Sequence, residues 1–185
     1  MLSYKIIYTL MGTFFSFLIL GCLASFAVAG LSMAPWVPTK KNDVKRFLEV
    51  LNMSEWEKFL EIGTWDGRVA MAVAQKYHNN YVVGIELAPP IFFLAFIRKF
   101  FSGNTHNLRY VLGNAFSLNF WDYEHIYVFW MPDKMQKKIV PKFMSEASKG
   151  AKLYSYVFSI PEEFRASSIS YGQEHEAKIH ILEKK

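Results

Sequence analysis

The sequence is poor in residues that build cross-links and metal sites. It has one cysteine, Cys22, and five histidines scattered along 185 residues. A single cysteine excludes an intramolecular disulfide framework and a cysteine-based metal site. No two histidines form an HxxxH or HxH pair, so the sequence predicts no metal. It also lacks an arginine-rich run and any zinc-finger or RNA-binding pattern, and we expect no nucleic-acid partner.

Charge is missing from the N-terminal region. No charged residue occurs from Ile6 to Ala34, and the apolar run Ile6–Leu31 exceeds the roughly 20 residues that a membrane-spanning helix needs. A cleaved signal peptide is the alternative, with Lys5 as its basic region and Ala27-Val28-Ala29 as its cleavage site. Because the run is longer than the apolar core of a signal peptide, the sequence favours an uncleaved anchor.

This run divides the chain into a membrane anchor, residues 1–34, and one globular domain, residues 35–185. The end of a membrane helix that carries more Lys and Arg remains in the cytoplasm, or in the matrix of a mitochondrion. Only Lys5 and the amino terminus precede the helix, whereas four cations follow it: Lys40, Lys41, Lys45 and Arg46. We therefore expect a single-pass membrane protein whose domain lies on the cytoplasmic or matrix side.

Strand and helix patterns alternate through the domain. Strands are expected at Lys58–Ile62, Tyr81–Glu86, Leu108–Leu112, His125–Trp130 and Lys152–Phe158, before a C-terminal hairpin of Ser167–Tyr171 and Lys178–Leu182. Helices are expected at Asp66–Tyr77, Pro90–Phe101 and Asp133–Ser148, after a first helix that Asn42 or Asp43 caps. Such alternation predicts an α/β domain with a parallel sheet covered on both faces.

The segment Glu61–Arg68 (EIGTWDGR) is the most informative stretch for chemistry. A strand ends in an acid, and a glycine loop then opens a helix, at the edge where open α/β sheets bind ligands. The loop is neither GxGxxG nor a P-loop, and the Glu61 carboxylate would repel a phosphate. An acid there suits a cationic ligand, and Glu86 is placed to accept the ribose hydroxyls of a nucleoside. Together the two acids favour S-adenosylmethionine. The alternative for the loop alone is that Glu61 is a strand-end acid and the glycines are ordinary turn residues.

With these motifs in order, the chain resembles the class I S-adenosylmethionine-dependent methyltransferases. It is most similar to the membrane-anchored protein-lysine methyltransferases that act on the ATP synthase c-subunit and the adenine nucleotide translocase. The resemblance implies a Rossmann-like seven-stranded sheet preceded by one N-terminal transmembrane helix. It rests on the anchor and on six elements: Pro35–Thr39, the Glu61–Arg68 loop, Gly84–Pro89, Gly113–Phe116, Phe129–Pro132 and Phe158–Pro161.

The resemblance also implies roles for individual residues. The substrate mouth would include Trp36, Trp130 and Pro132, with Trp65 a further aromatic candidate, because an apolar mouth lowers the pKa of a lysine amine. No residue is singled out as a catalytic base. Asp66 is expected chiefly to cap its helix. The S-adenosylmethionine site would consist of Glu61, Gly63, Thr64, Trp65, Asp66, Gly67, Glu86, Leu87, Asn114 and Ala115.

Three functions from different classes stay open at this point. The first is a membrane-anchored protein-lysine N-methyltransferase that acts on a membrane-embedded protein. The second is a methyltransferase with a small-molecule or lipid substrate. The third is a non-catalytic, membrane-tethered module with a degenerate cofactor site. This last alternative arises because Trp65 replaces a loop glycine of the family and Asn114 replaces the acid that accepts from the adenine amine.

The segment Pro90–Phe101 (PIFFLAFIRKFF) is apolar on nearly every side before it reaches Arg98 and Lys99. A buried core helix is the simpler prediction. The alternative is a helix that rests on the bilayer, with its apolar side in the lipid and its cations at the headgroups.

Overall fold

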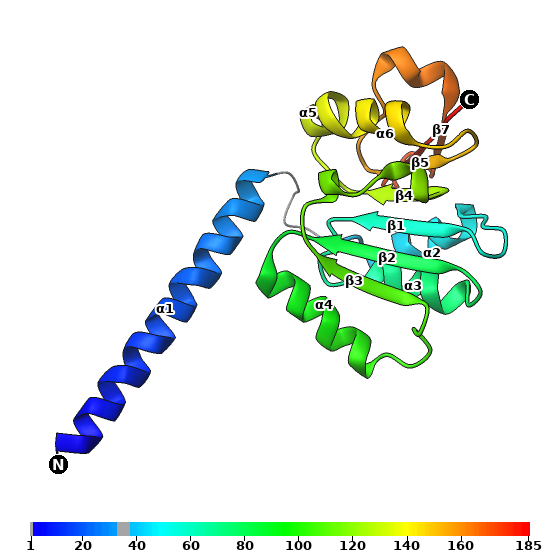
Figure 1. Cartoon of the computed structure of the whole chain (residues 1–185). Helices are drawn as coiled ribbons and strands as arrows, with labels where there is room; N and C mark the ends of the chain where they lie inside the picture. The colour runs from blue at the N-terminus through cyan, green and yellow to red at the C-terminus, as the bar shows by residue number, and fades with distance from the viewer. Residues whose placement is uncertain (1, 33–37) are drawn as a thin grey trace.

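The computed structural model describes residues 2–32 and 38–185. It contains one long N-terminal helix and an α/β domain (Figure 1). The helices are α1 (Leu2–Ser32), α2 (Lys41–Val50), α3 (Arg68–Lys76), α4 (Pro89–Phe101), α5 (Pro132–Lys134) and α6 (Val140–Glu146), with a π-turn, η3 (Met135–Ile139), between the last two. The strands are β1 (Lys58–Ile62), β2 (Tyr81–Glu86), β3 (Leu108–Leu112), β4 (His125–Val128), β5 (Lys152–Tyr156), β6 (Ser168–Tyr171) and β7 (Ile179–Glu183). Short 3-10 turns are η1 (Ala115–Ser117), η2 (Phe120–Asp122) and η4 (Glu162–Ser167).

The seven strands form one sheet in the order β3-β2-β1-β4-β5-β7-β6. The first five strands in the sequence are parallel, and β7 pairs antiparallel with both β5 and β6. This confirms the predicted seven-stranded sheet and its C-terminal hairpin. Because β1 lies between β2 and β4, its carboxyl end is at the point where the strand order reverses, and such points are where open sheets bind ligands.

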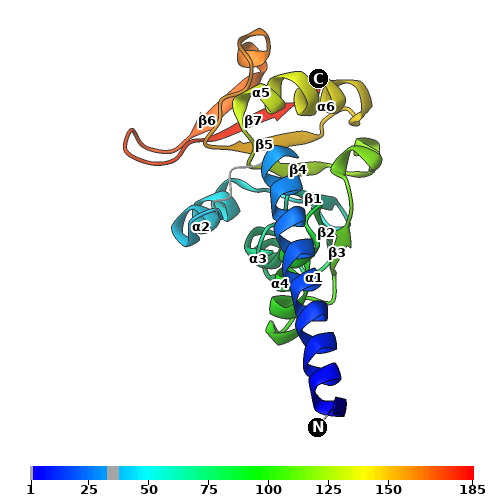
Figure 2. The same cartoon turned by 90° about the vertical axis from the view of Figure 1, so that its left-hand side faces the viewer.

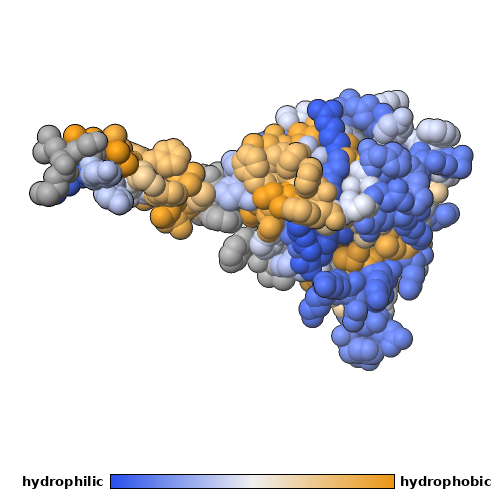
Figure 3. Space-filling view, turned by 90° about the horizontal axis from the view of Figure 1, so that it is seen from below, coloured by the Kyte–Doolittle hydropathy of each residue, from blue (hydrophilic) through white to orange (hydrophobic). Residues whose placement is uncertain are grey.

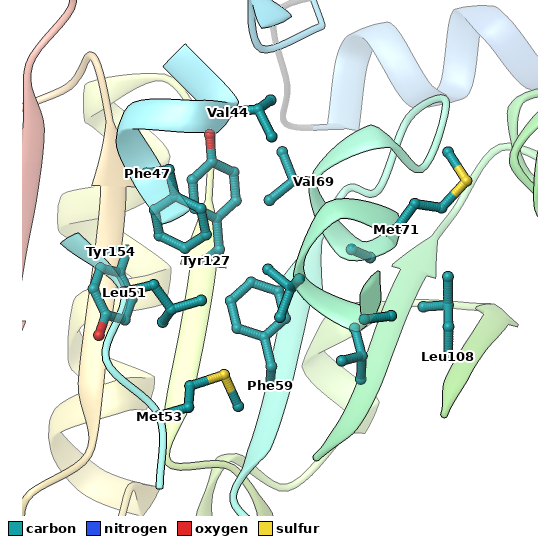
Figure 4. Packing of buried hydrophobic residues seen from close by; sticks show 14 of the residues in the cluster. Val44, Phe47, Leu51, Met53, Phe59, Val69, Met71, Leu108, Tyr127 and Tyr154 are labelled. Carbon is teal, nitrogen blue, oxygen red and sulfur yellow. The ribbon is translucent and has the colours of Figure 1, made fainter. Parts of the chain in front are cut away.

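Helices cover the sheet on both faces (Figure 2). On one face, α2 and α3 pack on the sheet through an apolar cluster that contains Phe47 and Phe59. The ring of Tyr127 packs at a tilt against that of Phe47, with 4.7 Å between ring centroids (Figure 4). On the other face, η3 and α6 supply Met135, Ile139 and Phe143 to a second cluster. Residues alternate between the two clusters along β1, so Leu60 and Ile62 face α6 while Phe59 faces α3.

The helix α1 extends away from the domain and contacts α4 (Figure 1). Its segment Tyr4–Ala24 is 21 residues long and none of it is buried. At 1.5 Å per residue, this segment measures about 31 Å, close to the thickness of a bilayer core. The predicted boundary between anchor and domain, at residues 34 and 35, lies outside the described residues.

The expected helix Asp133–Ser148 is interrupted in the structure. Its middle turn is the π-turn η3, and α6 begins one residue before Pro141. A proline has no N–H to donate to the carbonyl of the residue four positions earlier, and its ring clashes with that carbonyl. The turn before Pro141 therefore widens. The prediction of one continuous helix was therefore wrong in its centre.

The structure differs from both predicted helix caps, wholly at α2 and by one residue at α3. The N-cap of α2 is Lys40, without a side-chain cap; Asp43 lies in the first turn and accepts hydrogen bonds from Arg46 at 2.6 Å and from the Tyr156 hydroxyl at 2.6 Å. The N-cap of α3 is Gly67, one residue after Asp66, although one carboxylate oxygen of Asp66 still accepts from the N–H of Arg68, the first residue of the helix, at 3.3 Å. In both cases one nearby arginine and one distant side chain hold the acid: Arg46 and Tyr156 bind Asp43, and Arg68 and Arg98 bind Asp66.

The buried His125, at the start of β4, should make the free energy of unfolding depend on pH. Its Nδ1 lies 3.0 Å from the Tyr154 hydroxyl and its Nε2 lies 2.9 Å from a carboxylate oxygen of Glu57. Burial lowers the pKa of His125 below 6.5, against the raising effect of Glu57. On acidification, His125 therefore takes up its proton in the unfolded chain before it does so in the folded protein. The contribution of neutral His125 to the free energy of unfolding is complete above pH 6.5 and falls as the pH drops below that value.

We expect the His125→Gln variant to lose this part of the pH dependence. Denaturant unfolding followed by circular dichroism from pH 5 to pH 8 measures it. The difference between wild type and variant should shrink toward pH 5, by at most about 1.4 kcal/mol per pH unit. Parallel stability curves for the two proteins would show that His125 keeps the same pKa in the folded and unfolded chain.

Candidate cofactor site

The loop between β1 and α3 winds through three left-handed residues. Gly63, Trp65 and Gly67 have φ angles of 71°, 53° and 77°. Glycine adopts this region freely, whereas a side chain such as that of Trp65 is strained there. The loop is tied to the next strand because the N–H groups of Gly63 and Thr64 both donate to the Ile85 carbonyl, at 2.9 and 3.1 Å.

The carboxylate of Glu61 lies beneath this loop. One of its oxygens accepts hydrogen bonds from the Thr64 hydroxyl at 2.6 Å and from the Ala70 N–H, in the first turn of α3, at 2.9 Å. Burial raises the pKa of Glu61 to about 8, although these hydrogen bonds act in the opposite direction. Glu61 is therefore mostly protonated at neutral pH, and a cation brought close to it would favour the ionised form.

Glu86 ends the neighbouring strand and holds the other side of the loop. One carboxylate oxygen accepts from the Trp65 N–H at 3.1 Å, and the other accepts from the Ala88 N–H at 2.9 Å. Burial raises its pKa above the usual value. The next side chain, Leu87, is 37% exposed. These backbone contacts fix the direction of the Glu86 carboxylate while each oxygen retains a lone pair for a further donor.

Asp66 is surrounded by arginines. It forms ion pairs with Arg68, at 2.5 Å, and with Arg98 of α4. Burial alone would raise the pKa of Asp66, but the hydrogen bond and charge of Arg68 and the charge of Arg98 lower it. Arg68 also donates to the Thr39 carbonyl at 2.9 Å. Asp66 thus joins the loop to α4 and to the start of the domain, and its predicted contact with the cofactor stays a prediction.

The segment after β3 reaches the same edge of the sheet. Asn114 is exposed, and its side-chain oxygen accepts from the Phe116 N–H at 3.0 Å, which caps η1. Ala115 is buried. The Asn114 amide group keeps two N–H donors and one acceptor lone pair, so it remains able to bind a ligand.

The predicted substrate-mouth residues fall in different places. Trp130, which follows β4, is only 5% exposed and its ring packs 5.8 Å from that of Phe116. Pro132 is exposed at the start of α5. Trp36 lies outside the described residues. Of the predicted mouth residues, Trp130 lies beside the loop, and Pro132, two residues later in the chain, lies at the surface.

The indole N–H of Trp130 is a buried hydrogen-bond donor beside the loop, where a polar ligand could bind. Its Nε1 is buried and has no hydrogen-bond partner among the described residues. A Cβ added at Gly63 would lie 3.2 Å from this nitrogen, so the N–H group is directly beside the loop backbone. A buried donor without an acceptor is unfavourable. A ligand with an acceptor group, such as the carboxylate of S-adenosylmethionine, would supply one, and the residues present fit that cofactor.

We predict that Trp130→Phe weakens cofactor binding. The variant keeps an aromatic ring against Phe116 but lacks the N–H donor. The loss of one hydrogen bond should lower the affinity for S-adenosylhomocysteine by about 10-fold in calorimetric titration. The matched control is Trp121→Phe, at an exposed position on η2. Equal affinities for the Trp130→Phe variant and wild type would mean that this donor does not contact the cofactor.

Two contributors to the site were missed by sequence reasoning. The hydroxyl of Tyr110, on β3, donates to the Gly67 carbonyl at 2.9 Å and supports the loop from below. Arg98 reaches Asp66 from α4 across 32 positions of the sequence. Neither residue stands in a recognisable motif, and only the pairing of β3 with β2 and the packing of α4 bring them to the loop.

Comparison with known proteins agrees with this geometry. No protein-family model matches the chain. The chain is 27% identical over 128 residues to a protein-lysine N-methyltransferase of Saccharolobus islandicus (strain REY15A), which covers 68% of this chain and 78% of that protein.

Solved methyltransferase structures share the fold. An RNA methyltransferase from Salinibacter ruber, in complex with S-adenosyl-L-homocysteine, superposes with a TM-score of 0.71 at 22% identity, over 80% of this chain and 93% of that one. An S-adenosylmethionine-dependent O-methyltransferase from Thermotoga maritima superposes with a TM-score of 0.65 at 10% identity, over 80% of this chain and 66% of that one. With the acids and glycines of the loop in place, sequence similarity and fold together identify the chain as a class I S-adenosylmethionine-dependent methyltransferase.

Proposed function

We propose that this methyltransferase is a membrane-anchored protein-lysine N-methyltransferase that acts on a membrane protein. The observation that carries the lysine specificity is the sequence similarity to a protein-lysine N-methyltransferase along 78% of that protein. The observation that supports the anchor is α1, whose apolar segment is long enough to cross a bilayer. The two parts of the proposal therefore have separate support: the sequence similarity concerns the substrate, and α1 concerns the location in a membrane.

The residues proposed to hold the cofactor surround the carboxyl ends of β1, β2 and β3. Glu61 would face a positive group, Glu86 would accept the ribose hydroxyls, and Trp130 would donate to an acceptor beside Gly63. Leu87, Asn114 and Ala115 would contact the base. When bound, S-adenosylmethionine supplies an activated methyl group.

Aromatic side chains would prepare a lysine for this chemistry. The ring of Phe129 packs 4.8 Å from that of Tyr156 and 5.8 Å from that of Phe158, next to the buried Trp130. Such an apolar surround favours the neutral amine, because burial in a low-dielectric site disfavours the charged form. Aromatic faces also tolerate the methylated cation that results.

The proposed orientation follows the cations after the anchor. Lys40, Lys41 and Lys45 are all exposed at the start of the domain. Cations beside a membrane helix stay on the cytoplasmic side, or on the matrix side in a mitochondrion. We propose this side for the domain.

A labelling experiment tests the lysine specificity. The purified full-length protein in detergent is incubated with methyl-labelled S-adenosylmethionine and membranes of a strain that lacks the gene. We expect label in a membrane-protein band, with methyl-lysine located by mass spectrometry, and no label with the Glu86→Gln variant. Label confined to the lipid or solute fraction would favour a lipid or small-molecule substrate. No label together with no cofactor binding would favour the non-catalytic module, with Trp65 closing the site.

A further inference from the structure

The outer face of α4 is a continuous apolar surface. Only Ile91 and Ala95 of this helix are buried against the domain. The simpler sequence expectation, a buried core helix, was therefore wrong. Exposed apolar patches of this kind on one element mark a binding surface. The outer face consists of Phe93, Leu94, Phe96, Ile97, Phe100 and Phe101, all exposed.

The two cations of α4 do not lie on this face as free charges. Arg98 turns inward to the carboxylate and carbonyl of Asp66. Lys99 donates to the Leu108 carbonyl of β3. The sequence alternative placed both cations at lipid headgroups, and the structure instead satisfies them with protein groups. The outer face of α4 is consequently uncharged, which suits apolar surroundings.

The position of α4 indicates what covers this face. The helices α1 and α4 contact each other. Figure 1 shows that α4 runs across the direction of α1, beside the part of α1 that is nearer to the domain, with the strands on the far side of α4. Figure 3 shows, from below, the apolar surface of the domain gathered next to α1. A bilayer crossed by α1 would therefore have its surface along α4.

We propose that the outer face of α4 lies in the interface of the same bilayer that α1 crosses. The apolar side chains would enter the boundary between headgroups and acyl chains, as in other helices that rest on membranes. This inference goes beyond the proposed function, because it concerns a surface and not the reaction. It has a consequence for the site: α4 begins three residues after Glu86, so the carboxyl ends of β1 and β2 are held close to the membrane.

Environment-sensitive labels test this placement in the full-length chain. An NBD label is attached to Phe100→Cys in a Cys22→Ala background, and the protein is inserted into vesicles of phosphatidylcholine and phosphatidylglycerol. The matched control is Ile169→Cys in the same background, because Ile169 is also apolar and exposed but lies on β6 at the other edge of the sheet. A third sample carries the label on the native Cys22 and reports the insertion of α1.

We expect the label at position 100 to shift its emission to the blue and to be quenched by nitroxide groups on the lipid acyl chains. The label at position 169 should show neither effect, and a label at Phe96→Cys should repeat the result for position 100. A quenched label at Cys22 with a water-exposed label at position 100 would overturn the inference and leave the anchor intact. A blue shift at position 100 that disappears when each vesicle holds one protein would overturn the inference in favour of contact with a second copy. A blue shift that appears only after another membrane protein is added would overturn it in favour of a protein partner.

None of these readouts involves methyl transfer. A failure of the α4 placement is therefore distinguishable from a failure of the proposed lysine specificity, which the labelling of membrane proteins tests separately.

Discussion

Glu61→Gln should lower the affinity for S-adenosylmethionine by about 10- to 100-fold while the loop stays folded. The loss corresponds to one charge-assisted contact. A glutamine still offers an oxygen to the Thr64 hydroxyl and to the Ala70 N–H, which Glu61 accepts at 2.6 and 2.9 Å. The variant therefore removes the negative charge and keeps the acceptor that holds the first turn of α3. Alanine is a poorer test, because it would also remove that acceptor.

The same variant should change how binding depends on pH. The pKa of Glu61 is about 8 in the free protein, so its carboxylate must lose a proton to pair with a positive group. We expect wild-type affinity to rise between pH 6 and pH 8, by up to about 10-fold per pH unit, and to level off above pH 8. Calorimetric titration in buffers of different ionisation enthalpy should show proton release at pH 7. The Glu61→Gln variant should show neither effect.

Stability supplies an independent readout for Glu61. The raised pKa means that the folded protein keeps a proton which the unfolded chain releases above about pH 4.5. The contribution of the protonated Glu61 carboxyl to the free energy of unfolding is complete below about pH 4.5 and declines as the pH rises toward 8. Relative to Glu61→Gln, the wild type should lose about 3 kcal/mol of unfolding free energy between pH 4.5 and pH 7. The control is Glu49→Gln, at an exposed position of α2, and a wild-type curve parallel to that of Glu61→Gln would contradict the assignment.

The sequence was most informative where periodicity and chain order decide the structure. The strands Lys58–Ile62, Tyr81–Glu86 and Leu108–Leu112 were predicted with the bounds that the structure shows. Buried parallel strands are short apolar runs between turn residues, and this pattern depends little on distant contacts. The order of the glycines and acids then placed Glu61 and Glu86 at the carboxyl ends of adjacent strands.

Predictions that depend on distant partners were less successful. Asp66 was assigned to the end of a helix, but Arg98 and Arg68 hold it, and an arginine 32 positions away cannot be paired from one sequence. The apolar segment of α4 looked like a core helix because hydrophobicity alone does not say which side meets the sheet. In the structure only Ile91 and Ala95 of α4 are buried, and the larger aromatic side chains face outward.

Gly67→Ala should be the most damaging single-methyl change in the domain. Gly67 has a φ of 77°, and a Cβ there would lie 2.0 Å from the Tyr110 hydroxyl oxygen and 2.7 Å from its ring carbon. Left-handed strain and the steric clash together should cost about 3 kcal/mol of unfolding free energy, or about 10 °C in thermal unfolding. Cofactor affinity should fall as well, because the displaced Tyr110 no longer supports the loop. Gly103→Ala is the control, since nothing lies within 4 Å of a Cβ at that position.

A double variant separates the clash from a general defect at this position. In the wild type, Tyr110→Phe removes the hydrogen bond to the Gly67 carbonyl, so it should destabilise the domain by about 1 kcal/mol. In the Gly67→Ala background the same change removes the atom nearest to the new methyl group, so it should restore part of the lost stability. The two effects of one substitution have opposite signs, and this sign reversal is the result that a thermal unfolding cycle must show. If Tyr110→Phe destabilised both backgrounds equally, contact between β3 and the loop would not be what makes a glycine necessary at position 67.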